Sequence, residues 1–200
     1  MLFLESPVSN VCKSFTPSYA SLTKCSVWDI LKPDSKYPDS LLYKALLEFA
    51  AEGLITRSAL DNWFVNLKEW SIDTAKPEHS LQSTLATIYF HAISIYLSGI
   101  FDYRCQFIDI ITPTISQAAV QGHVDVILAE TETALRTSNL GPVLFFFPLR
   151  VAGARVTSLP ETASILAMLR EISRRSFVVA DAFTTDLKSL WQHKGIQYFQ

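Results

Sequence analysis

The sequence predicts an all-α protein: one domain of about six to eight helices over residues 38–200, behind a weakly ordered N-terminal arm of residues 1–37. Apolar residues recur at intervals of three and four along most of the chain, which is the helical period. No Asn-Gly or Asp-Gly pair marks a β-hairpin. With 49% hydrophobic and 18% charged residues among 200, the chain has enough apolar side chains to fold around one core.

The arm and the first two helices are predicted from local signals. Residues 1–37 mix Ser, Thr, Pro and Lys with isolated hydrophobics and hold no period for two turns. Residues 38–40, Pro-Asp-Ser, precede a helix that we expect to end at Gly53, where glycine suits a C-cap. A second, short helix is expected from a cap at Ser58 to about Trp70.

The most apolar segment, residues 85–101, carries no formal charge and follows a helix start at Pro77. Its length just reaches that of a membrane span. Four of its polar residues share one helical stripe: Thr87, His91, Ser94 and Ser98. A core helix with one polar edge benefits from such a stripe and a lipid-exposed helix does not. We therefore expect a buried helix of a soluble protein, ending at Gly99.

Further helices are expected in the second half of the chain. Thr112 and Pro113 are typical of the cap and first residue of a helix that runs to about Thr137. Small residues on its face, such as Gly122, would let another helix approach closely. Residues 143–156 are too apolar to be exposed and could be a buried strand or a buried helix, although their proline argues against a central strand.

Two final helices complete the predicted domain. Ser158 and Glu161 form a capping box, S-x-x-E, at the start of the first of them. The last helix is expected to pack through Phe177, Ala180, Phe183, Leu187, Leu190 and Trp191. The core is predicted to include Leu85, Ile88, Tyr89, Phe145, Leu166, Leu169 and Phe183.

Charge and cysteine usage bear on the class of function. A net charge of -2 gives no field that would attract a polyanion such as DNA. Cys12, Cys25 and Cys105 are odd in number and widely spaced, which predicts neither a disulfide framework nor a metal site and favours a reduced, intracellular compartment. The first ten residues lack a basic stretch ahead of their apolar residues, so they do not predict a secretory signal.

No catalytic, metal or cofactor site is predicted. The histidines are His79, His91, His123 and His193, and none has a cysteine or second histidine within four residues. The glycines form no phosphate-binding pattern. Ser21 and Lys24 match S-x-x-K but lack its companion motifs. Cys105 could pair with His91 or His123, yet a small core residue is the favoured interpretation.

Three polar residues in apolar surroundings allow two interpretations each. Arg150 and Arg155 could bind an anionic ligand, but pairing with carboxylates is favoured. His91 could line a pocket, but an interhelical hydrogen bond is favoured.

Three stretches, residues 89–104, 141–156 and 165–191, carry a family resemblance. In this order they resemble the carboxyl-terminal regulatory region of fungal transcription factors of the binuclear zinc cluster type, particularly those associated with secondary metabolism. The likeness covers residues 38–195 and rests on apolar helices and a Pro-Leu-x-Val-Ala-Gly element at residues 148–153.

The resemblance implies a nuclear, all-helical domain for transcription regulation that acts through a protein partner or a homodimer, with a small-molecule effector in some members. The family's six-cysteine zinc cluster and its basic DNA-contacting segment are missing, since only Cys12 and Cys25 lie in that part of the chain. We therefore expect no direct DNA binding, and a chain that is a fragment, a mis-bounded gene product or a stand-alone cofactor.

Two hypotheses of different class follow. The first is a regulatory interaction domain that uses its C-terminal helical layer, with Phe183 and Trp191 as partner contacts. The alternative is a small metabolite-binding protein or enzyme of a fungal biosynthetic cluster. Its aromatic pocket would be lined by Tyr89, His91, Tyr96 and Arg104.

Overall fold

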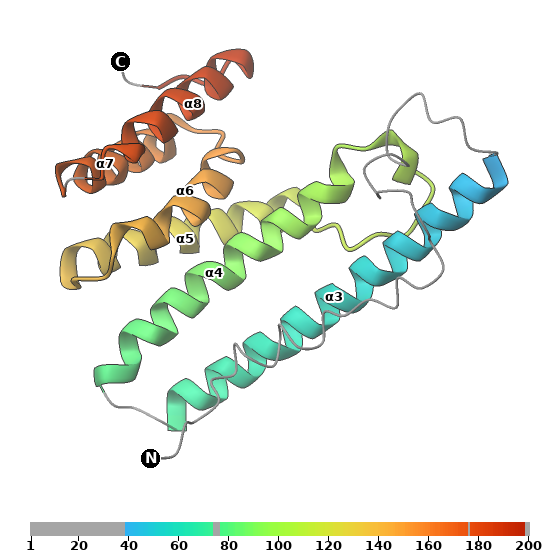
Figure 1. Cartoon of the computed structure of the whole chain (residues 1–200), viewed down its shortest axis with the longest axis horizontal. Coiled ribbons are helices and arrows are strands. Elements are labelled where there is room, and N and C mark those ends of the chain that lie inside the picture. The colour runs from blue at the N-terminus through green and yellow to red at the C-terminus, as the bar shows by residue number, and fades with distance from the viewer. Residues whose placement is uncertain (1–38, 74–76, 176, 199–200) are drawn as a thin grey trace. The chain divides into compact units, whose positions relative to one another are not determined.

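The computed structural model describes residues 39–73, 77–175 and 177–198, and these form an all-α fold without strands (Figure 1). The predicted fold class is thereby confirmed. The chain divides into two compact units, Met1–Ala45 and Leu46–Gln200. The predicted arm, residues 1–37, lies outside the described residues.

Six α-helices and two short 3-10 helices make up the described part of the chain. In order they are α3 (Asp39–Asp73), α4 (Pro77–Asp102), η1 (Cys105–Phe107), α5 (Gln117–Thr137), η2 (Pro142–Phe145), α6 (Phe146–Gly153), α7 (Leu159–Arg174) and α8 (Val179–His193). All of them except the first residues of α3 belong to the unit Leu46–Gln200.

Helix α3 is one continuous helix of 35 residues, so the predicted end at Gly53 and the separate helix from Ser58 are wrong. Gly53 is buried in the middle of α3. A Cβ atom at this position would lie 2.6 Å from Cζ of Phe101 and 2.9 Å from Cγ of Pro113. The glycine therefore allows a close approach of other segments and does not end the helix.

Helix α4 begins at Pro77 as predicted, and it continues three residues beyond Gly99 to Asp102. By length and composition the segment Ser80–Asp102 could cross a membrane, a test that the core helix of a soluble protein also passes. Here Ile88, Ala92 and Ile95 of α4 are almost fully buried in the core. The packing is that of a core helix.

Helix α5 begins later than predicted. Its N-cap is Ser116, whose hydroxyl accepts a hydrogen bond from the backbone N–H of Ala119, and not Thr112. Because the Ser116 hydroxyl makes the capping bond, the Thr112-Pro113 signal falls in the preceding loop. A Cβ added to Gly122 would meet nothing within 4 Å, so the expected close approach of another helix at this glycine is wrong.

The apolar segment 143–156 is helical, which decides against the buried strand. It forms most of η2 and the whole of α6. The capping box of α7 is confirmed: Oε2 of Glu161 accepts hydrogen bonds from the backbone N–H groups of Ser158 at 2.9 Å and Thr157 at 3.0 Å.

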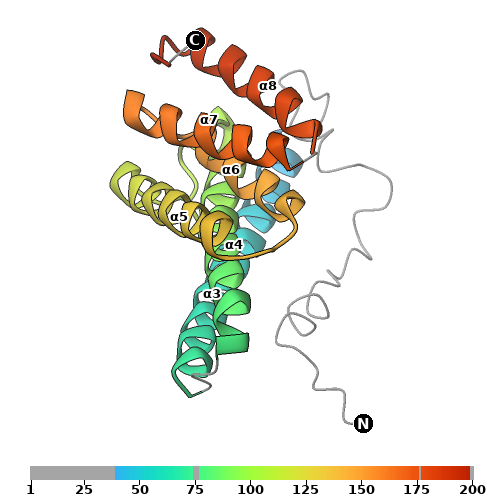
Figure 2. The same ribbon diagram turned by 90° about the vertical axis from the view of Figure 1, so that its left-hand side faces the viewer.

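The core gathers around α6, which contacts α4, α5, α7 and α8 (Figure 2). Four predicted core residues are at most 2% exposed: Ile88, Phe145, Leu166 and Leu169. Leu85 and Phe183 pack against this core partly buried, and Tyr89 is half-buried. Helices α7 and α8 pack on each other along the face predicted for the last helix, with Ala180, Leu187 and Trp191 fully buried.

Candidate functional site

The polar edge of α4 is turned toward neighbouring segments, as expected of a core helix. Ser94 and Ser98 are fully buried. The Ser98 hydroxyl donates to Oδ2 of Asp102 at 2.8 Å and accepts from the backbone N–H of Ile115 at 3.1 Å. The edge therefore ties α4 to the chain that enters α5.

The same edge brings two histidines together. Nδ1 of His91 on α4 lies 2.6 Å from Nδ1 of His123 on α5, so one ring donates and the other accepts. This confirms the interhelical hydrogen bond favoured for His91. Burial, His123 and Lys68 together lower the pKa of His91 from 6.5 to about 4. Burial and Arg57 also lower the pKa of His123, against an opposing effect of Asp61.

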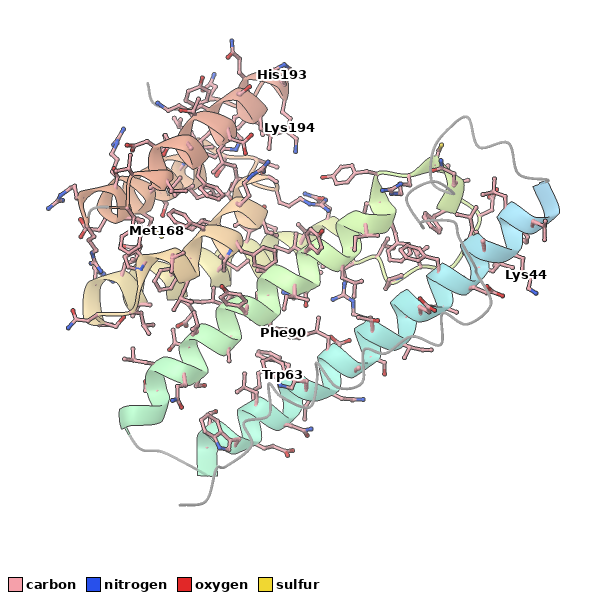
Figure 3. The ribbon with its side chains drawn as sticks, in the orientation of Figure 1. Lys44, Trp63, Phe90, Met168, His193 and Lys194 are labelled. Atoms are coloured by element: carbon pink, nitrogen blue, oxygen red, sulfur yellow. The ribbon has the colours of Figure 1, made fainter. Side chains whose placement is uncertain are left out.

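Aromatic rings close the histidine pair on the side of α3. Phe64 of α3 stacks on Phe90 of α4 with ring centroids 3.7 Å apart and planes within 3°. Both rings meet His91 edge-on, at 5.5 Å and 5.1 Å. Phe90 points from α4 toward α3 (Figure 3). The ammonium of Lys68 lies 4.4 Å from the Phe64 ring centroid, which is a cation–π contact.

Arg57 links α3 to the same region. Its Nη2 donates to the backbone carbonyl of Ser94 at 2.8 Å and to that of Pro113 at 3.1 Å. Burial lowers the pKa of Arg57, and Asp61 partly reverses this effect. The guanidinium thus serves as a hydrogen-bonded brace between α3, α4 and the segment before α5.

The chemistry available at the histidine pair is proton binding. Among the residues that the structure describes, no three His, Cys, Asp or Glu side chains gather in a geometry for a metal ion. The positive charges of Lys68 and Arg57 lower the pKa values of the two histidines, and the carboxylate of Asp61 raises the pKa of His123. Such surroundings disfavour a bound cation and favour uncharged imidazoles.

The predicted aromatic pocket does not assemble as expected. Tyr89 and Tyr96 both contact the ring of Phe147, at 5.9 Å and 6.0 Å, and the Tyr89 hydroxyl donates to the backbone carbonyl of Leu144 at 3.0 Å. His91 follows Tyr89 by two residues, about 200° around α4, and faces α5 instead.

Arg104 lies beyond the end of α4, in the position before η1. The four residues proposed to line the pocket therefore separate into a pair on Phe147, a histidine bonded to His123, and a residue in the connection to η1.

The two proposed partner contacts of the last helix are engaged inside the protein. Phe183 stacks on Phe146 at 4.7 Å with planes within 4°. Trp191 is fully buried, and its Nε1 donates to the backbone carbonyl of Gly153 at 2.7 Å. A fully buried indole cannot meet a partner without unfolding, so the expectation for Trp191 is corrected: it is a core residue.

Arg150 and Arg155, the two arginines of the apolar stretch, both pair with carboxylates. This confirms the interpretation that the sequence favoured. Nε of Arg150 lies 2.7 Å from Oδ2 of Asp186, and Nη2 of Arg155 lies 3.4 Å from Oδ2 of Asp102. Cys105, in contrast, is exposed in η1, so its interpretation as a small core residue is wrong. Cys105 lies beyond the end of α4, so it does not continue the buried apolar face of that helix.

Helix α3 carries two lines of residues with the alternating four-three spacing of packed helices. We name the first the inner seam; it consists of Leu46, Ala50, Gly53, Arg57, Leu60, Phe64, Leu67 and Ser71. All its members are buried or half-buried. The second, the outer seam, follows one residue later and consists of Leu47, Ala51, Leu54, Ser58, Asp61, Val65, Lys68 and Ile72. All its members are exposed.

The outer seam is the main surface feature that the sequence-based prediction missed. Its four large apolar side chains, Leu47, Leu54, Val65 and Ile72, are between 38% and 75% exposed. It runs about 100° around the helix from the inner seam, because successive residues of an α-helix are rotated by that angle. The four-three spacing of these residues could have revealed the outer seam. It was missed because the predicted helix end at Gly53 divides the row into two parts.

No protein-family model matches the chain, and no curated protein and no solved structure shows significant similarity to it.

Proposed function

We propose that this chain is a transcription-regulatory interaction domain that acts through a protein partner bound at the outer seam of α3. The observation that carries the proposal is the row of exposed apolar side chains along one line of a helix whose other apolar line is already packed. Rows of apolar residues at this spacing are the contact surface of helix pairs. Several large apolar side chains exposed on one face of a folded protein are typical of a docking site.

The finer part of the proposal, control of a fungal secondary-metabolite gene cluster from the nucleus, is supported by the sequence resemblance. Its three stretches, residues 89–104, 141–156 and 165–191, all fall in the unit Leu46–Gln200. They contribute the whole of α6 and parts of α4, α7 and α8, which pack around one core. A shared core fits a single folding unit better than three unrelated matches.

The alternative, a metabolite-binding protein or enzyme, has less support. Its proposed pocket needs His91 beside Tyr89 and Tyr96, but His91 is bonded to His123 on a different side of α4. The Tyr89 hydroxyl is also occupied by the carbonyl of Leu144. Few polar groups are therefore left to orient a ligand there.

The test tethers the whole chain to a heterologous DNA-binding module, one that binds DNA as a monomer, above a reporter gene in a fungal cell. We expect the tethered chain to change reporter expression. The double variant Leu54→Asp with Val65→Asp should return expression to the level of the module alone, because two charges interrupt the outer seam.

The matched control is Ile108→Asp. Ile108 is 83% exposed, lies just after η1 and is not a member of the outer seam. It should leave reporter expression unchanged, and circular dichroism should show equal helix content in all variants. The proposal is contradicted if the wild-type chain leaves the reporter unaltered, or if the seam variant and Ile108→Asp behave alike.

A further inference from the structure

We infer that the partner at the outer seam is an amphipathic helix of another protein, which carries Lys or Arg residues beside its apolar stripe. This inference rests on the proposed function in one respect, that the outer seam binds protein. The chemistry of the partner comes from the charges that border the seam.

One side of the outer seam is bordered by a further line of exposed residues, which we name the outer flank. Each of its members follows an outer-seam residue by one position, about 100° farther around α3 from the inner seam. The outer flank consists of Glu48, Glu52, Ile55, Ala59, Asn62, Asn66 and Glu69, and all of these are exposed. Its three charged residues are all glutamates, so this border of the seam is acidic.

The nearest lysines of α3 do not neutralise the outer flank. The ammonium of Lys68 lies 4.4 Å from the ring centroid of Phe64, which belongs to the inner seam. This contact draws the lysine of the outer seam toward the inner seam and away from the outer flank. Lys44 precedes both lines and belongs to the other compact unit. The negative charge beside the outer seam is therefore left to a partner.

Glu52 and Glu69 are the two charges on which the inference depends. Within the described part of the chain, neither of them takes part in an ion pair. They are 17 residues apart in the sequence, which is about 26 Å along the helix. The outer-flank residues between them are uncharged, and Ile55, at 70% exposed, widens the apolar surface beside Leu54.

The spacing and the charges together specify the chemistry of the partner. Apolar residues with alternating four-three spacing receive the side chains of a second helix. Charged residues that border such a stripe pair with opposite charges on the second helix, and these pairs set the choice of partner. The outer flank therefore fits a helix with Lys or Arg at two positions about 17 residues apart and uncharged residues between them.

The same charges disfavour other surfaces that could cover an apolar helix face. Nucleic acids and anionic membranes are negatively charged, so Glu52 and Glu69 would repel them. A second copy of this chain would bring a second acidic flank to the contact. A basic amphipathic helix combines an apolar stripe with the complementary charge.

The first test measures the binding of two synthetic helical peptides of about 25 residues to the whole chain by fluorescence anisotropy. Both peptides carry Leu at four-three spacing; one has Lys, and the other has Glu, at the two flanking positions. At low salt we expect the Lys peptide to bind about 10-fold more tightly, because two attractive pairs replace two repulsive ones. Salt at about 1 M should reduce this preference by screening. Equal affinities, tighter binding of the Glu peptide or no binding of either would overturn the inference.

Charge reversal in the protein locates the effect. Glu52→Lys with Glu69→Lys should reverse the preference, so that the Glu peptide binds more tightly. The matched control, Asp125→Lys with Glu132→Lys, makes the same change of net charge at two exposed residues of α5. It should retain the preference for the Lys peptide. Equal behaviour of the two double variants would mean that net charge alone attracts the peptide, and the inference would be wrong.

The apolar part of the contact is tested without a change of charge. Leu54→Ser with Val65→Ser should weaken the binding of the Lys peptide about 10-fold, because apolar anchors dominate helix contacts. Circular dichroism should show the helix content of the wild type in every variant. Unchanged affinity would place the peptide elsewhere. Sedimentation equilibrium that shows a dimer of the wild type, dissociated by this variant, would identify a second copy as the occupant and refute the inference.

The reporter assay separates the two proposals. Suppose that Leu54→Asp with Val65→Asp abolishes reporter control but Glu52→Lys with Glu69→Lys does not. The outer seam then binds a protein without a basic flank, so the inference fails and the proposed function stands. If the Lys peptide binds as described but the reporter responds to neither variant, the inference stands and the proposed function is contradicted.

Discussion

Acidification should destabilise the protein through the histidine pair. His91 and His123 share one Nδ1–Nδ1 hydrogen bond of 2.6 Å, which needs at least one imidazole to be neutral. Burial lowers the pKa of both rings, and that of His91 falls from 6.5 to about 4. Lys68 and Arg57 of α3 oppose a further positive charge, and Asp61 of α3 favours it.

The direction and size of the effect follow from proton binding. Between pH 6.5 and about 4, His91 binds a proton in the unfolded chain but not in the folded chain. The free energy of unfolding therefore decreases as the pH is lowered through this window. From pH 7 to pH 5 the full effect would be about 2 kcal/mol, at 1.36 kcal/mol per pKa unit below 6.5. Because the ring is only half-buried, solvent screening reduces this to about 1 kcal/mol.

The assay is urea unfolding at pH 7 and pH 5, followed by circular dichroism. The matched control replaces His91→Gln and His123→Asn together, which keeps a donor and an acceptor but removes both titrating groups. Carboxylates and the other histidines contribute alike to both proteins. The wild type should therefore lose about 1 kcal/mol more than the control. Equal losses in the two proteins would show that the pair does not resist protonation and would refute the reasoning.

Four further predictions concern the packing and one helix cap. Gly53→Ala should destabilise the protein by about 1 to 3 kcal/mol although alanine favours helices, since the new methyl group would lie 2.6 Å from an aromatic carbon. Gly122→Ala, with open space around its Cβ, should stabilise it by about 1 kcal/mol; urea unfolding compares the two. Trp191→Phe should cost about 2 to 4 kcal/mol, because a cavity forms and a buried carbonyl loses its donor; a smaller shift in the unfolding midpoint would contradict this. Glu161→Ala should cost about 1 kcal/mol by removing a helix cap, again read from urea unfolding.

Much of the fold could be predicted because its signals are local. The capping box at Glu161 and the proline at Pro77 act within one turn of chain, so their meaning does not depend on distant partners. The periodic faces of α7 and α8 likewise specify which side is buried. Residues 143–156 remained ambiguous because a short apolar run has the same pattern in a strand and in a buried helix.

The sequence-based predictions are wrong where contacts with a segment distant in the sequence determine the local structure. Glycine is common at helix ends, which is why the sequence predicts an end at Gly53. The glycine is instead needed inside the helix, because a Cβ atom there would clash with Phe101 and Pro113, which lie many residues later. The cap of α5 moved from Thr112 to Ser116 because both positions offer a side-chain hydroxyl and only one makes the bond. The sequence favoured a hydrogen bond for His91 but not its partner, since His123 lies 32 residues away on another helix.

The two seams of α3 depend on the same glycine. Each outer-seam residue directly follows an inner-seam residue, so both lines stay straight only if the helix is uninterrupted through residue 53. A side chain there would push against Phe101 and shift α3 relative to α4. The packing of α3 on α4 and the straight course of both seams therefore depend on the same residue.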